Sequence, residues 1–404
     1  MRREGVFITV VLCAPFLFFS GSGAAAPGRV LEIARGHSWV SPYWGYSSPK
    51  IVCDGRAYYT AGLWGAKPDS AEGVLYKYDG AAWREGVHLP NIYQPVTMVV
   101  DNQGRLIAAY TEQSQPIRTY RSKTSGNIDE MERLSSPPDM KSAYYIGMAI
   151  REDTLFLAYL TAPEYSMFLT TLDLLSLEWT PSRLVCQGQV ERKPKTAWTY
   201  PILYAAKDGL HLVASNSPDG NEGNSYNQVW YLFYPNGARE PSIREIVAET
   251  PMGHVSYATD FAVDETGVSH ILFMWNQRWY GDPLPPDSPS AGLYDAWRSS
   301  STGKWQRVCL GPVGIAGYLE SEKSLAAAVI PNTLFRWQGQ QEGWKNAGTF
   351  YDASFAPGTP GFLDVISRAS GSDTHKGIAA VMDSLMTTER DKPQERVLWS
   401  VLPE

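Results

Sequence analysis

A short module recurs along this chain: an apolar strand-like segment, a turn built from Asp or Asn with Gly, and a second apolar segment. The copies are Ile51–Tyr59, Val99–Ile107, Tyr204–Leu212 and Ala262–Ile271. Asp and Asn side chains bond their own backbone in tight turns and Gly accepts positive φ, so each copy predicts a β-hairpin. The turn residues Asp54 and Asp101 lie about 47 residues apart, a spacing typical of propeller blades.

A second module follows the first and ends in a tryptophan that opens its last strand. The returning tryptophans are Trp83, Trp179, Trp305 and Trp344. Together the two modules form a four-stranded unit of about 45–50 residues, the size of a β-propeller blade. A chain of two packed sandwiches is the alternative, but it does not account for the returning tryptophan.

We therefore predict an all-β fold, a single seven-bladed β-propeller within residues 26–404. Its blades are expected at roughly 49–88, 95–135, 143–187, 200–248, 258–310, 317–350 and 360–402. Val30–Ala34 is expected to pair with Val397–Val401, closing the ring and removing an exposed sheet edge. Only Asp129–Leu134 and Ser321–Ile330 have a pattern that also allows a helix.

The composition supports a folded, acidic protein. Aromatic residues make up 12% of the chain, charged residues 19%, and the net charge is −7. Enough apolar residues to fill a core exclude disorder, and the absence of basic blocks argues against a nucleic-acid partner. Cys53, Cys186 and Cys309 are far apart and none lies in a Cys-x-x-Cys pair, so we expect buried thiols with at most one disulfide.

The start of the chain has the pattern of a secretory signal peptide. Basic residues at Arg2 and Arg3 precede an apolar run, Val6–Phe19, and the small residues Ser20–Ala26. Because proline follows Ala26, cleavage is expected after Ala24 or Ala25, giving a signal peptide of about 25 residues. Cys13 lacks the small preceding residue of a lipid anchor. We expect a secreted or periplasmic monomer with no membrane segment after cleavage.

Three segments carry a family resemblance: Ser41–Pro49, Asn91–Arg118 and Tyr257–His270. They are similar to the BNR-repeat, sialidase-like propellers, and within these to the branch that contains polysaccharide lyases acting on uronate-bearing glycans. The resemblance implies an enzyme of an extracellular polysaccharide, lyase-like or glycosidase-like. The chain also departs from it: Ile92 or Tyr93 stands where those lyases usually carry His, no faithful copy of the sialidase Asp-box is present, and a sialidase arginine triad cannot be assigned.

In propellers of this kind, the residues just before each innermost strand face a central pocket. Here they are Tyr46, Tyr93, Gln94, Trp198, Tyr200, His254 and Tyr257. Such a rim suits sugars, whose C–H faces stack on aromatic rings while hydroxyls bond Tyr, Gln and His. The alternative is that these aromatic side chains pack between blades.

Elimination beside a uronate carboxylate needs a base for the proton α to the carboxylate and a cation to neutralise it. His254 is the first candidate base, with Tyr200 and Tyr257 as further catalytic candidates; a loop histidine bonded to backbone is the alternative. The candidate cations are Arg118, Arg121 and Arg278. Asp260 with Glu112 would instead form the carboxylate pair of a glycosidase. His270 lies within a strand pattern and is expected to be a core residue.

No cofactor is predicted. The segment Asp219–Glu222 resembles part of a calcium loop, but the full ligand pattern is missing, so a solvated turn is the expectation. Two functions stay open: an enzyme acting on a polysaccharide, or a non-catalytic propeller that binds a glycan or a protein through the same face.

Overall fold

The protein is described by a computed structural model that covers most of the chain. The described residues are 28–44, 49–67, 70–191, 195–218, 226–251, 254–278, 291–299, 303–312, 316–321, 324–329, 332–352, 355, 359–365, 371–372, 379–386 and 394–402. The predicted signal peptide, Tyr46 and Asp219–Glu222 lie outside them. No helix in the described part of the chain has the length and apolarity needed to cross a membrane.

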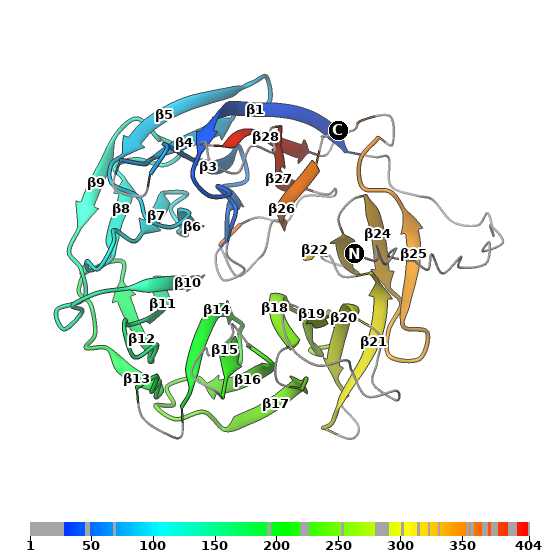
Figure 1. Ribbon diagram of the computed structural model, residues 1–404. Helices are drawn as coiled ribbons and strands as arrows, with labels where there is room; N and C mark the ends of the chain where they lie inside the picture. Colours follow the sequence, from blue (N-terminus) through cyan, green and yellow to red (C-terminus); the bar gives the residue numbers. More distant parts are fainter. Residues whose placement is uncertain are drawn as a thin grey trace, which may run out of the picture.

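Seven four-stranded antiparallel sheets form a ring, which confirms the predicted all-β, seven-bladed propeller (Figure 1). Blade 1 contains β2 (Ile51–Cys53), β3 (Tyr58–Trp64), β4 (Glu72–Tyr78) and β5 (Trp83–Leu89). Blade 2 contains β6 (Thr97–Val100), β7 (Leu106–Tyr110), β8 (Arg118–Ser122) and β9 (Met131–Leu134). Blade 3 contains β10 (Tyr144–Arg151), β11 (Thr154–Leu160), β12 (Met167–Asp173) and β13 (Arg183–Cys186).

The remaining blades repeat this order. Blade 4 contains β14 (Ala197–Ala205), β15 (Gly209–Ser217), β16 (Gln228–Pro235) and β17 (Ile243–Glu249). Blade 5 contains β18 (His254–Val263), β19 (Ser269–Arg278), β20 (Gly292–Arg298) and β21 (Trp305–Gly311). Blade 6 contains β22 (Ala316–Ser321), β23 (Ser324–Val329), β24 (Thr333–Trp337) and β25 (Trp344–Gly348). The two segments whose pattern also allowed a helix thus contain strands β9 and β23.

Blade 7 is built from both ends of the chain. Its strands are β26 (Thr359–Val365), β27 (Ala380–Leu385), β28 (Gln394–Leu402) and β1 (Arg29–Ser38). β1 pairs antiparallel with β28, with Val30 opposite Val401, so the predicted closure of the ring is confirmed. The innermost strands are β2, β6, β10, β14, β18, β22 and β26 (Figure 1). Because each blade is built outward from this strand in the same order, all inner strands run in one direction along the ring axis. The face on which they begin is called the entry face below.

The repeated turn aspartates close the hairpins as predicted. Asp54 Oδ1 accepts the backbone N–H groups of Arg56 and Ala57, and Asp101 Oδ1 accepts those of Gln103 and Arg105. The glycines of these turns have positive φ, 84° at Gly55 and 71° at Gly104. Asp264 of blade 5 makes the same turn, with its Oδ1 accepting the N–H groups of Thr266 and Val268, so the module recurs because the inner hairpins of these blades close in the same way.

The returning tryptophans join neighbouring blades. Each indole N–H donates to the blade that precedes its own in the ring: Trp83 to Ser400 Oγ (2.8 Å), Trp179 to Ser135 O (2.7 Å), Trp305 to Glu245 Oε2 (2.8 Å) and Trp344 to Asp295 Oδ2 (2.7 Å). A large ring that fills the space between two sheets and carries one donor suits this position. The repeat seen in the sequence is thus an inter-blade contact.

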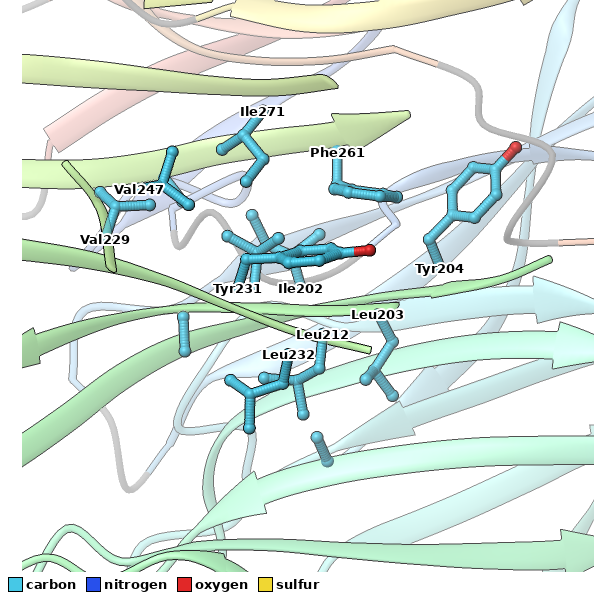
Figure 2. Packing of buried hydrophobic residues seen from close by; sticks show 14 of the residues in the cluster. Ile202, Leu203, Tyr204, Leu212, Val229, Tyr231, Leu232, Val247, Phe261 and Ile271 are labelled. Carbon is cyan, nitrogen blue, oxygen red and sulfur yellow. The ribbon is translucent and has the colours of Figure 1, made fainter. Parts of the chain in front are cut away.

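Apolar side chains from both faces of each blade fill the gaps between blades. In Figure 2, Ile202 and Tyr231 of blade 4 lie toward Phe261 and Ile271 of blade 5, whereas Leu212 lies on the opposite face of its sheet. This alternation follows from the two-residue period of a strand. Cys53 and Cys186 are buried free thiols, whereas Cys309 is an exposed free thiol, so the expectation that all three are buried is wrong for Cys309.

A buried ionic group lies between blades 5 and 6. The ring nitrogens of His270 lie 3.2 Å from Asp295 Oδ2 and 3.6 Å from Asp264 Oδ2. Tyr318 and Trp344 of blade 6 donate to Asp295, and Trp337 of the same blade donates to Asp264. His270 is 0% exposed, so it is a core residue, as predicted.

Burial would lower the pKa of His270, but the charges of Asp295 and Asp264 outweigh it and raise this pKa to about 9. Burial would likewise raise the pKa of Asp264, but the positive charge of His270 and hydrogen bonds from Val268 and Thr266 hold it at about 2. The group is therefore an imidazolium held between two carboxylates.

Candidate functional site

Two tyrosines at the starts of inner strands have a backbone conformation that bulky residues rarely adopt. Tyr145 of blade 3 has φ 43° and Tyr200 of blade 4 has φ 49°. Both lie at irregularities of register, between Tyr144 and Gly147 in β10 and between Thr199 and Ile202 in β14. A bulge redirects a side chain, and such left-handed residues cost of order 1–3 kcal/mol each. The surrounding structure must hold both tyrosines in place.

The redirected rings meet other aromatic side chains near the entry face. Tyr145 and Tyr200 have ring centroids 4.8 Å apart, and Tyr200 lies 5.4 Å from Tyr257 of blade 5. Tyr257 in turn lies 5.7 Å from Tyr226. Trp44, from the segment between β1 and β2, contacts both Tyr145 (5.5 Å) and Tyr200 (6.3 Å). We call Trp44, Tyr145, Tyr200, Tyr226 and Tyr257 the aromatic cluster.

A second aromatic group adjoins the cluster through the chain. Tyr93 lies between Trp39 (5.7 Å) and Tyr144 (5.9 Å), and Tyr144 immediately precedes Tyr145. Burial raises the pKa of Tyr93, and burial together with the nearby Tyr165 raises the pKa of Tyr145. Both phenols are therefore neutral at neutral pH, so each O–H can donate a hydrogen bond.

Gln94 holds the backbone of Tyr145 through its side chain. Its side-chain oxygen accepts the backbone N–H of Tyr145 at 2.7 Å and the hydroxyl of Thr111 at 3.2 Å. Gln94 is 5% exposed. Gln94 was predicted to contact sugar hydroxyls. Its side-chain oxygen instead accepts a hydrogen bond from the strained backbone of Tyr145 in blade 3.

The register of blade 5 brings two predicted residues together. His254 begins β18 and is paired in register with Arg278, the last residue of β19. The His254 side chain is buried, 2% exposed, and its backbone N–H donates to Pro251 O at 3.1 Å. Tyr257 follows three residues along the same strand, and its ring belongs to the aromatic cluster. The structure describes the backbone of Arg278 only.

Asp260 has a different setting from the one predicted. Its two carboxylate oxygens accept the backbone N–H groups of Phe261 (2.8 Å) and of Tyr318 in blade 6 (2.6 Å). Glu112, its predicted partner, forms an ion pair with Arg118 at 3.0 Å in blade 2. Asp260 thus bonds the next blade, and no contact among the described residues makes a carboxylate pair of Asp260 and Glu112.

A lysine that the sequence did not single out lies near Asp260. Lys50, just before β2, is 3% exposed, and burial lowers its pKa to about 8 against the charges of Asp364 and Asp260. Its backbone N–H donates to Asp364 Oδ2 at 2.6 Å, and burial raises the pKa of Asp364. The carboxylates of Asp364 in blade 7 and Asp260 in blade 5 therefore both affect the pKa of Lys50, which precedes blade 1.

Two further candidates lie away from the aromatic cluster. Trp198 is 4% exposed within the core of blades 3 and 4, where its indole N–H donates to Gln187 O at 3.1 Å. Residues 198 and 200 of a regular strand would lie on the same face of the sheet. The bulge after Thr199 changes this, so Tyr200 reaches the aromatic cluster while Trp198 stays in the core. Arg121 bonds Glu132 Oε1 (2.8 Å) and reaches Leu174 O of blade 3.

Tyr144, Tyr145, Trp44 and Tyr226 were missed by sequence reasoning. Tyr144 and Tyr145 open the inner strand of blade 3, the position that selected Tyr93 and Tyr200 in other blades, so the same rule finds them. Trp44 and Tyr226 have no such signal. Among the described residues, no group of three or more His, Cys, Asp or Glu side chains is placed to hold a metal ion.

Comparison with known proteins identifies similar folds but no family for this chain. No family model matches the chain, and no curated protein matches it. The propeller is similar to a PL25 ulvan lyase solved bound to -[GlcA(1-4)Rha3S]-, with a TM-score of 0.62, 10% identity, and 91% of this chain and 95% of that chain covered. It is also similar to the polysaccharide lyase Uly1, with a TM-score of 0.60, 10% identity, and 89% and 90% covered. At this identity the likeness establishes a shared propeller fold, and no matching model supports the narrower sialidase-like label.

Proposed function

We propose that the protein is an exported enzyme that cleaves a uronate-bearing polysaccharide by β-elimination over the aromatic cluster. The observation that carries the proposal is the pair of strained tyrosines, Tyr145 and Tyr200, whose bulges bring their rings together with Tyr257 and Trp44. Backbone strain of this kind is concentrated at functional sites. The fold shared with two polysaccharide lyases, one of them bound to a GlcA-containing glycan, supports the substrate class.

The chemistry assigns a role to each group. A base removes the proton from C5 of the uronate, the C4–O4 bond breaks, and the departing oxygen takes a proton, leaving a C4–C5 double bond. His254 is the proposed base, and Arg278, its partner in register, is the proposed cation for the carboxylate. Tyr145 is the proposed donor of a proton to the leaving oxygen, because its phenol is neutral and its ring lies in the cluster.

Elimination is favoured over hydrolysis by the contacts of the carboxylates. A glycosidase needs two carboxyl groups facing one glycosidic bond. Asp260 is engaged by two backbone N–H groups and Glu112 by Arg118. A hydrolytic role for Asp260 would require it to leave both contacts.

The test is an assay of the purified protein on uronate-containing polysaccharides, read at 235 nm, where the unsaturated product absorbs. We expect activity that falls about 10²–10⁴-fold in His254→Ala, because a general base contributes that factor. Tyr145→Phe should reduce the rate and Tyr159→Phe should not, because Tyr159 is a buried phenol of blade 3 that packs on Phe168, outside the cluster.

Other results would replace the proposal. Reducing ends without absorbance at 235 nm would indicate a hydrolase. Silence in both assays, with glycan binding retained and weakened only a few-fold in His254→Ala, would identify the non-catalytic binder. The exported state is tested separately by mass spectrometry of the mature N-terminus, which we expect to begin at Ala25 or Ala26.

A further inference from the structure

A groove lies between blades 3 and 4, at the opposite end of the inner strand β10 from the aromatic cluster. It has a volume of about 730 Å³, within the range of ligand-binding pockets. Arg151, the last residue of β10, lines it, whereas Tyr144 and Tyr145 open the same strand. The hairpin between β16 and β17, with Asn236 and Arg239, forms the other side. The groove therefore opens toward the face opposite the entry face.

The charged residues that line the groove are all arginines. Arg151, Arg183 and Arg239 line it, and neither Asp nor Glu does, although the chain as a whole carries a net charge of −7. Carboxylates stand beside it: Asp139 accepts two hydrogen bonds from Ser182 (2.9 and 2.8 Å), Glu240 follows Arg239 and Glu152 follows Arg151. Three guanidinium groups in one concave surface favour a ligand that carries negative charge.

Two of the arginines are held in place by neighbouring groups. Arg151 donates to Ala206 O (2.7 Å) and Asn236 Oδ1 (2.5 Å) of blade 4, and its guanidinium lies 5.4 Å from the Phe156 ring centroid. The Arg183 guanidinium lies 4.4 Å from the ring centroid of Tyr234. A stacked guanidinium keeps its N–H groups in one plane, which matches the geometry of carboxylate and sulfate oxygens.

The rest of the lining suits a sugar. Thr171, Thr180 and Ser182 supply hydroxyls, and Leu169 with Pro235 supplies apolar surface. Ligand sites of this type combine an apolar lining with a few placed polar groups. We propose that this groove is a second binding site, distinct from the aromatic cluster, for an anionic oligosaccharide whose carboxylate or sulfate groups bind Arg183 and Arg239. The choice of a glycan rests on the proposed function; the choice of an anion rests on the groove alone.

The test measures oligosaccharide binding by calorimetry in the full protein. Oligogalacturonate carries carboxylates only, a carrageenan oligosaccharide carries sulfates only, and maltohexaose carries neither. We expect one or both anionic probes to bind and maltohexaose not to bind. The variant Arg183→Gln/Arg239→Gln should weaken that binding about 10²–10⁴-fold, since each of the two charge-assisted hydrogen bonds that it removes is worth about 10–100-fold.

The matched control is Arg56→Gln/Arg133→Gln, which removes the same charge from two exposed arginines of blades 1 and 2. Equal weakening in both variants, or none in the groove variant, would overturn the proposal. Retained activity at 235 nm on short substrates in the groove variant separates the two sites. Anion binding lost in the groove variant of a protein without lyase activity would leave the groove established and the proposed function refuted.

Discussion

The side-chain oxygen of Gln94 in blade 2 accepts the backbone N–H of Tyr145 in blade 3 at 2.7 Å. This bond holds a residue whose φ is 43° and thereby places its ring in the aromatic cluster. We expect Gln94→Leu to lower the free energy of unfolding by about 1–3 kcal/mol, because the buried N–H of Tyr145 loses its acceptor. Urea denaturation measures this loss.

Thr111→Val is the control for that change. It removes the other donor to the same oxygen, at 3.2 Å, but leaves the bond to Tyr145 intact. Its expected cost is about 0.5–1.5 kcal/mol. Equal losses in the two variants would show that the Tyr145 contact has no special role.

The returning tryptophans differ in what their indoles bond, and their replacement should differ accordingly. Trp344 donates to the fully buried carboxylate of Asp295, Trp305 to the partly exposed Glu245 and Trp179 to a backbone carbonyl. Each change to Phe keeps an aromatic ring and removes the indole N–H, and the ring contacts of Trp344 with Tyr318 and Trp337 add to the cost of its replacement. We expect the destabilisation to decrease in the order Trp344→Phe, Trp305→Phe, Trp179→Phe, since bonds to charge are worth about 1.5–3 kcal/mol and neutral ones about 0.5–1.5. Thermal unfolding that reverses this order would contradict the assignment.

The pH dependence of stability should report the buried His270. Its pKa is raised to about 9, so the stability that it contributes is complete below its unfolded pKa of about 6.5 and is lost as the pH rises toward 9. The whole contribution is of order 3 kcal/mol. Asp264, with a pKa of about 2, contributes fully above about pH 4 and does not change in this window.

The useful range is pH 6.5 to 8. Above pH 8, Lys50 acts in the opposite direction, because its lowered pKa makes the folded state gain stability as the pH rises. In His270→Gln the slope of unfolding free energy against pH should be shallower than in the unaltered protein. The exposed His88, whose pKa is also raised, contributes equally to both curves. Identical slopes would show that His270 is not the titrating group.

Trp44 should affect substrate binding more than turnover, because its contacts with Tyr145 and Tyr200 are ring contacts of the edge type. If the proposed function holds, Trp44→Leu should raise KM about 2–10-fold, the value of one aromatic contact, with little change in kcat. Trp44→Phe, which keeps an aromatic ring, should recover most of the loss. A large fall in kcat in both variants would place Trp44 in the chemistry instead.

The fold could be predicted because its determinants are local and repeated. Asp54 and Asp101 need only their own turns, and the tryptophans at 83 and 305 recur at equivalent points of their blades. Fold-defining residues of this kind leave a period in the sequence. The same rule located Tyr93, Tyr200 and Tyr257 at the starts of inner strands.

The details of the site depend on features that leave no such signal. Tyrosine has no preference for positive φ, so the sequence does not indicate a bulge at Tyr145 or Tyr200. Without the bulge in β14, Trp198 and Tyr200 are predicted to share one face of the sheet, which they do not. The pairing of His254 with Arg278 follows from the length of one hairpin, and the setting of Lys50 depends on strands of blades 5 and 7. These relationships are long-range, and a single sequence does not display them.

Ring closure imposes an order on synthesis. β1 precedes blade 1 in the chain, but its partner β28 follows blade 6 and ends at residue 402, so β1 lacks its sheet partner while blades 1 to 6 are emerging. Those blades can form successive hairpins and pack on one another as they appear, because their pairings are between consecutive strands. The interface between blades 1 and 7 is completed only once β28 is available. Until β28 has been made, β1 and β27 keep unpaired strand edges exposed, so dependence on chaperones should be greatest just before β28 is made.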